Sequence, residues 1–160
     1  MKRPIFILSA MLIALSAISQ TTYYKGEWSR SGTTYNYSGF LKLTIKGNEA
    51  QGEVIWKLIT PDKVNKDDYE FLKDKVGFSA VEIMSGSYDA ETKDLNINGI
   101  DEIDPHDIMD KDEYRLKISS NGKVIFGKTY TGGTDGSFYA ILQKTATAAP
   151  EYATLRKKIK

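Results

Sequence analysis

Residues 39–59, GFLKLTIKGNEAQGEVIWKLI, decide the fold. In the first half of this stretch apolar residues occupy every second position: Leu41, Leu43 and Ile45. After a turn that contains glycine, the second half repeats the pattern: Val54, Trp56 and Leu58. A period of two with one apolar face is typical of an antiparallel strand buried on one side. The stretch therefore predicts a β-hairpin.

The same pattern extends outward in both directions. Residues 113–130, EYRLKISSNGKVIFGKTY, predict a second hairpin, in which Asn121-Gly122 supplies the positive φ angles of a tight turn. Further strands are predicted at 22–29, 79–89, 93–99 and 135–144. About eight strands joined by short turns indicate an all-β, antiparallel up-and-down meander, either a barrel or a two-sheet sandwich.

One segment between the strands has a helical pattern. In NKDDYEFLKDKVG (65–77), three apolar residues lie at helical spacing: Tyr69, Leu72 and Val76. Asn65 is a candidate N-cap and Gly77 a stop signal. We expect one short helix over an end or edge of the sheet.

The first nineteen residues have the pattern of an export signal. Met1-Lys2-Arg3 is basic, Ile5 to Ala17 is mostly apolar, and small residues lead to Ser19. This pattern predicts a signal peptide (1–19) cleaved between Ser19 and Gln20, and a secreted or periplasmic protein. The apolar run is shorter than the roughly 20 residues of a membrane span. We expect no membrane span in the mature chain.

The remaining chain predicts one domain at 20–145 and a flexible, basic, low-complexity tail at 146–160. Two of the 22 Lys and Arg residues lie in the leader and none of the 21 acidic residues does, so the mature formal charge is −1. Nothing in this balance favours nucleic acid as a partner. With no cysteine in an exported chain, the core must hold without disulfides.

Two motifs suggest ligand chemistry, and their context argues against both. Residues 122–129, GKVIFGKT, match the P-loop pattern, but the interior positions are strand formers and no helix pattern follows, so we expect no nucleotide cofactor. Residues 101–113, DEIDPHDIMDKDE, contain seven carboxylates and the single histidine, His106. Their spacing does not fit an EF-hand, and we expect a solvated loop shaped by Pro105 and no metal. An enzyme, such as a hydrolase with a carboxylate pair, is the less favoured class.

Aromatic residues are the remaining functional clue, with ten Tyr, six Phe and two Trp. Aromatics on an inner face either pack a core or line a ligand cavity. We assign Tyr114, Leu116, Ile118, Val124 and Phe126 to the inner wall beside the first hairpin's apolar faces. Such bulky residues leave room only near the mouth, where the candidate ligand-binding residues are Trp56, Tyr88 and Phe126.

Gly26-Glu27-Trp28, at the first predicted strand, resembles the G-x-W opening of the calycins, the lipocalin-like and avidin-like up-and-down barrels. The resemblance implies a closed barrel, which has no free sheet edge, and Trp28 packed across its closed end. The chain departs from lipocalins at Thr134-Asp135-Gly136, where they have T-D-Y, and it lacks a disulfide. We expect a binding module for a small apolar or sugar-like ligand. The alternative is a solid barrel that meets a protein partner through its surface.

Overall fold

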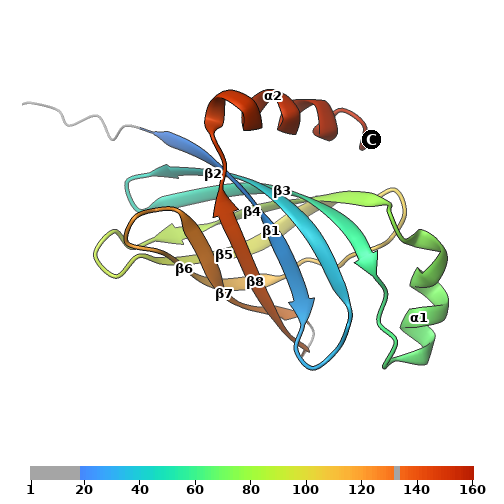
Figure 1. The fold of residues 1–160 in the computed structure, drawn as a ribbon. Helices are drawn as coiled ribbons and strands as arrows, with labels where there is room; N and C mark the ends of the chain where they lie inside the picture. Colours follow the sequence, from blue (N-terminus) through green and yellow to red (C-terminus); the bar gives the residue numbers. More distant parts are fainter. Residues whose placement is uncertain (1–18, 132–133) are drawn as a thin grey trace, which may run out of the picture.

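The computed structural model describes residues 19–131 and 134–160, so residues 1–18 of the predicted signal peptide lie outside the described part. Eight antiparallel strands follow one another around a closed barrel (Figure 1). The strands are β1 (Gln20–Arg30), β2 (Asn36–Lys46), β3 (Glu49–Thr60), β4 (Ser79–Tyr88), β5 (Asp94–Ile103), β6 (Glu113–Ile118), β7 (Val124–Thr131) and β8 (Thr134–Leu142). The predicted all-β meander is confirmed, and the barrel form replaces the sandwich alternative.

The barrel closes where β1 pairs with β8, from Tyr24 opposite Leu142 to Arg30 opposite Gly136. Gly26 lies within this seam, and a Cβ there would overlap the Tyr139 carbonyl oxygen. The two backbones approach closely at this point because glycine has no side chain. Closure leaves no strand with an unpaired side.

One end of the barrel interior is filled. The β2–β3, β4–β5 and β6–β7 turns lie at this end. The side chains that fill it are mostly aliphatic and almost fully buried: Leu41, Leu43, Leu95, Leu116, Ile118 and Ile125. Tyr24 closes this end by donating from its hydroxyl to the Gly122 carbonyl oxygen at 3.0 Å. Any open space of the interior therefore lies at the opposite end.

The inward face of β7 differs from the prediction by one residue. Ile125 is fully buried, whereas Phe126 is 43% exposed and pairs with Lys117 on the outer face. Val-Ile-Phe offers no polar residue to mark the outer side, so the sequence leaves the inward face undetermined, and a one-residue shift reverses every side chain. As predicted, residues 124–129 of the P-loop-like string form a strand.

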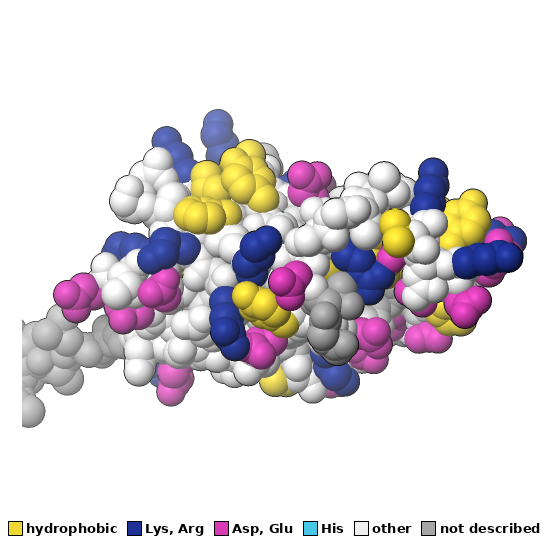
Figure 2. Space-filling view, turned by 90° about the horizontal axis from the view of Figure 1, so that it is seen from below, with side chains coloured by type: hydrophobic (Ala, Val, Ile, Leu, Met, Phe, Trp, Pro, Cys, Tyr) yellow, Lys and Arg dark blue, Asp and Glu magenta, His cyan; other side chains and the backbone are white. Residues whose placement is uncertain are grey.

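Exposed apolar side chains form a group on the outer face of β7 and β8, where Phe126 pairs with Tyr139. Phe126, Tyr139 and Ile141 are exposed on β7 and β8. Figure 2, which views the molecule from below, shows small groups of hydrophobic side chains separated by both cationic and acidic ones. This face is therefore mixed in charge.

The predicted helix is confirmed as α1 (Lys66–Leu72), followed by a 3-10 turn at Lys73–Lys75. Asn65 is its N-cap, and the Asn65 side chain accepts from the Asp67 and Asp68 amides. The helix lies between β3 and β4, at the end of the barrel opposite the filled one (Figure 1). Leu72 points into the core and is buried.

Residues 146–160 do not form the flexible tail that we expected, because a second helix, α2 (Thr145–Arg156), lies across the outside of the barrel (Figure 1). An outward apolar row crosses three neighbouring strands, Phe40, Ile55 and Val81, and Ala148, Tyr152 and Ile159 cover it. The Tyr152 hydroxyl also donates to the Glu53 carbonyl oxygen at 2.8 Å. The barrel is thus packed on both faces of β2 to β4.

Among the described helices, none combines the length and the apolar character that a membrane crossing requires.

Candidate functional site

A cavity of about 370 Å³ lies at the α1 end of the barrel. The loop between β5 and β6 (104–112) and the segment that carries α1 surround it. The cavity volume is at the lower end of the range of small-molecule sites. The lining comprises Trp28, Arg30, Tyr35, Tyr37, Trp56, Asp68, Phe71, Leu72, Glu82, Asp107, Ile108, Met109, Asp110, Asp112, Tyr114 and Thr131.

Three aromatic side chains near the ends of β1 and β2 form one wall. Trp28 packs edge-to-face on Tyr35 and Tyr37, with ring centroids 5.4 and 5.6 Å apart. The two tyrosine hydroxyls are 2.5 Å apart, and the Tyr37 hydroxyl donates to the Ile108 carbonyl oxygen. Burial raises the pKa of both tyrosines, so both stay neutral donors. The wall is fixed to the β5–β6 loop by these bonds.

Glu82, from β4, lines the cavity and is fully buried. Its carboxylate accepts from the Trp56 indole at 3.0 Å, from the Asp112 amide at 2.9 Å and from the Tyr114 hydroxyl. Burial raises the pKa of Glu82, and these three hydrogen bonds oppose the shift. All three donors are uncharged, so hydrogen bonds alone compensate the buried acid.

Asp112, at the end of the β5–β6 loop, brings a second carboxyl group to the same wall. Burial, and then the charge of Glu82, raise the pKa of Asp112 to about 7. The Thr129 hydroxyl and the Trp28 indole act in the opposite direction. Trp28 also donates to Thr129 Oγ1 at 2.5 Å. Near neutral pH the Asp112 carboxyl group therefore retains part of its proton.

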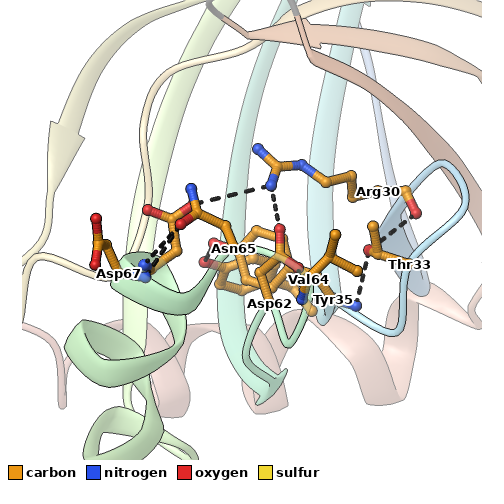
Figure 3. A network of polar contacts seen from close by, with 9 residues as sticks. Arg30, Thr33, Tyr35, Asp62, Val64, Asn65 and Asp67 are labelled. Atoms are coloured by element: carbon orange, nitrogen blue, oxygen red, sulfur yellow. Dashed lines mark hydrogen bonds and ion pairs between the residues drawn. The ribbon is translucent and has the colours of Figure 1, made fainter.

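Arg30, at the end of β1, is the single cationic side chain of the lining. Figure 3 shows that it reaches across to Asp62, with which it forms an ion pair. Asp62 is 1% exposed, and its carboxylate also accepts from the Val64 amide at 2.9 Å. Arg30 lies 3.9 Å from Asp68 of α1 as well. The Arg30 charge thus ties β1 to the segment that precedes α1.

The acidic stretch 101–113 is divided between the end of β5 and the loop that borders the cavity. Asp104 organises the loop by accepting from the Ile108 and Met109 amides at 2.6 and 2.9 Å. His106 stacks on Phe78, with ring centroids 3.9 Å apart. Across the described ranges, no three His, Cys, Asp or Glu side chains are grouped as metal ligands.

Of the three predicted ligand-binding residues, the cavity includes only Trp56. Tyr88 lies at the β4–β5 end of its strand, toward the filled half, and Phe126 faces outward. Trp28, which the calycin resemblance placed at a closed end, lines the cavity instead. Neither Glu82 nor Asp112 was identified from the sequence as a candidate site residue. A signal for Glu82 exists in AVEIM (80–84), where Ala80, Glu82 and Met84 share the inward face, because an acid inside a strand of apolar neighbours requires partners.

No known family model matches this sequence, and searches of curated proteins and of solved structures returned no significant match.

Proposed function

We propose that the protein binds a small molecule in the cavity at the α1 end of the barrel. One observation carries this proposal: the interior is filled at one end and hollow at the other, where aromatic rings and polar groups converge. Hydrophobic and aromatic side chains with a few fixed polar groups, arranged around a concave space, are typical of a binding site for a small molecule. This hollow disfavours the alternative of a solid barrel.

The size of the cavity favours a compact ligand. A space of about 370 Å³ suits a ring with a short substituent better than a long acyl chain. Aromatic faces on Trp28, Tyr37 and Trp56 offer apolar contact, and carboxyl groups offer acceptors. The ligand therefore combines an apolar or ring-shaped body with hydrogen-bond donors.

Intrinsic tryptophan fluorescence tests this proposal directly, because both tryptophans of the chain line the cavity. A library of small ring compounds should contain members that change the emission saturably and raise the melting temperature. A ligand at a hundred times its dissociation constant stabilises the fold by about 2.7 kcal/mol. Trp56→Phe should weaken such a ligand, whereas Phe126→Ser, on the outer surface, should leave its affinity unchanged. Equal effects of the two variants, or no saturable change with any compound, would contradict a cavity site.

Acid–base catalysis is the second candidate function. The observation that favours it is Asp112, whose pKa of about 7 places its carboxyl group near the ideal for proton transfer at neutral pH. A catalyst would convert a bound compound into a product, and Asp112→Asn would abolish the conversion. Proton NMR of each hit after prolonged incubation distinguishes turnover from simple binding.

A further inference from the structure

The cavity contains buried acid without a matching cation. Five carboxyl groups line it, from Asp68, Glu82, Asp107, Asp110 and Asp112. The single lining cation, Arg30, is already engaged by Asp62 and lies near Asp68. Among the described residues, no Lys or Arg forms an ion pair with Asp110 or Asp112. The described lining therefore has more acidic groups than cationic ones.

The nearest lysines do not offset this excess. The Lys75 ammonium donates to the Asp107 carbonyl oxygen over a distance of 3.0 Å. It also lies 3.3 Å from the centre of the Phe71 ring. Lys111 lies 4.0 Å from Glu102, and neither lysine lines the cavity. A buried carboxylate without a counter-charge is costly, because hydrogen bonds replace only part of its hydration. Glu82, fully buried beside Asp112, is in this position.

The remaining wall favours a positive charge as well. The faces of Trp and Tyr rings are electron-rich and attract cations within about 6 Å of the ring centre. Trp28, Tyr37, Trp56 and Tyr114 all contribute to the lining. Arg30 already uses one such ring, since its guanidinium carbon lies 5.6 Å from the centre of the Tyr35 ring. Carboxyl groups and aromatic faces together surround the hollow.

We infer that the cavity binds a small organic cation, an ammonium group on a compact ring or alkyl body, whose charge lies against the Glu82–Asp112 carboxyl pair. The inference rests on the proposed function and specifies its ligand. The ammonium supplies the missing counter-charge and donates to carboxyl oxygens, and the body contacts the aromatic wall. An organic cation is favoured over a metal ion, since no three His, Cys, Asp or Glu side chains of the described residues are grouped as metal ligands.

Matched probes test the charge separately from the shape. Phenethylamine, 2-phenylethanol and 3-phenylpropanoate share a ring and a short chain but carry positive, zero and negative charge. The corresponding hexyl series repeats the comparison without a ring. Titrations followed by calorimetry and tryptophan fluorescence at pH 8 should rank the amines first by at least about tenfold, and the carboxylates should show no binding.

Variants then locate the charge. Asp112→Asn should remove most of the preference for amine over alcohol while keeping the affinity for the alcohol. Glu91→Gln removes the same formal charge from the exposed β4–β5 turn, at the filled end, and should change nothing. Asp110→Asn serves as a second cavity variant if Asp112→Asn does not fold. Unchanged amine preference in folded cavity variants would overturn the inference.

Failure of the inference and failure of the proposed function give different results. Binding of the alcohols or carboxylates as tightly as the amines would overturn the cationic ligand and leave a small-molecule site. Absence of saturable binding by both series and by the wider library would overturn both. Selective binding of the amines that Asp112→Asn abolishes supports both.

Discussion

The Asp112 backbone amide donates to Glu82 Oε1 at 2.9 Å, so the residue that supplies one carboxyl group of the cavity also holds the other in place. The contact joins the β5–β6 loop to β4, thirty residues earlier in the chain. A change in the charge of either carboxyl group is therefore felt by the other, as the raised pKa of Asp112 indicates. The loop and the wall of the cavity form one electrostatic unit.

The first prediction concerns the pH dependence of stability. In the unfolded chain Asp112 loses its proton near pH 3.8, whereas in the folded protein it keeps the proton to about pH 7. Its contribution to the free energy of unfolding is therefore full below pH 3.8 and is lost as the pH rises toward 7. The upper limit of this loss of stability is about 4 kcal/mol. The actual loss should be smaller, because the carboxyl group is partly exposed to solvent.

Asp112→Asn should remove this loss of folding stability with rising pH. Urea unfolding at several pH values should give a stability difference, variant minus parent, that grows between pH 4 and pH 7. Glu91→Gln, in an exposed turn, is the control and should give a nearly constant difference. Parallel curves for Asp112→Asn and the parent would contradict the raised pKa.

The second prediction concerns the tie between Arg30 and Asp62. Although burial opposes it, hydrogen bonds from the Val64 amide and Arg30 lower the pKa of Asp62. The stability gained from this ionised carboxylate is present above about pH 3.8 and is lost as the pH falls through the lowered pKa. Arg30→Met should cost about 3 kcal/mol at pH 7, because it leaves a buried carboxylate without its partner.

The cost of Arg30→Met should be smaller at a pH well below 3.8 than at pH 7, because Asp62 without its cationic partner then gains a proton. Adding Asp62→Asn to Arg30→Met should recover part of the stability at pH 7, which a double-mutant cycle measures. A cost that is equal at both pH values would refute the ionic contribution.

The third prediction concerns the attachment of α2. Tyr152→Phe keeps the ring against Tyr23 and Phe40 but removes the hydroxyl bonds to the Glu53 carbonyl and carboxylate oxygens, at 2.8 and 2.9 Å. It should cost about 1 kcal/mol. Tyr152→Ala also empties the site beneath the helix and should cost about 3–5 kcal/mol.

Hydrogen exchange locates the effect. In Tyr152→Ala the amides of α2 should exchange much faster while those of β6 and β7 change little, because α2 packs on the other side of the barrel. Glu151→Gln, also in α2, removes the exposed pair with Lys25 and should cost a few tenths of a kcal/mol. Exchange that rises uniformly over all strands would argue that α2 does not open by itself.

The fourth prediction concerns the seam. Gly26→Ala places a Cβ against the backbone of Tyr139 and Ala140, which cannot rotate away as a side chain can. The β1–β8 pairing should weaken by about 3 kcal/mol or fail to form. Size-exclusion chromatography and urea unfolding measure this, with Ser29→Ala on the same strand as a control that should remain near the parent. A stable monomeric Gly26→Ala protein would show that the seam can spread without loss.

Patterns local to each segment were sufficient to predict the antiparallel meander, the hairpins and α1, through strand alternation for the strands and helical spacing for α1. The choice of a barrel over a sandwich depended on the calycin resemblance and on the absence of free edges in a closed sheet. No local pattern predicts the attachment of α2, because the residues it contacts lie far away in the sequence. The α2 sequence, TATAAPEYATLR, contains Pro150 and has little helical spacing of apolar residues. The helix packs on the outward apolar row of β2, β3 and β4. Adjacent apolar pairs in those strands, such as Phe40-Leu41 and Ile55-Trp56, indicate that both faces are covered.

The candidate site was predicted less completely than the fold. Trp56 was identified because it alternates with other inward residues. The positions of Tyr88 and Phe126 depend on the depth of the cavity and on the inward face of β7, and neither follows from local sequence. Glu82 and Asp112 lie thirty residues apart and meet only through strand register and the course of the β5–β6 loop. The raised pKa of Asp112 is therefore a property of the assembled barrel.

The pairing of β1 with β8 also sets the order in which the molecule can be completed. Tyr24 meets Leu142, more than a hundred residues later, so the ring remains open until nearly all strands have been synthesised. Contacts so distant in sequence make folding slow, because the chain loses conformational entropy before the β1–β8 hydrogen bonds and packing can compensate for it. During that interval the first strand has one unpaired edge, open to pairing with neighbouring chains. A chain built in this way gains from staying unfolded until its last strand is present.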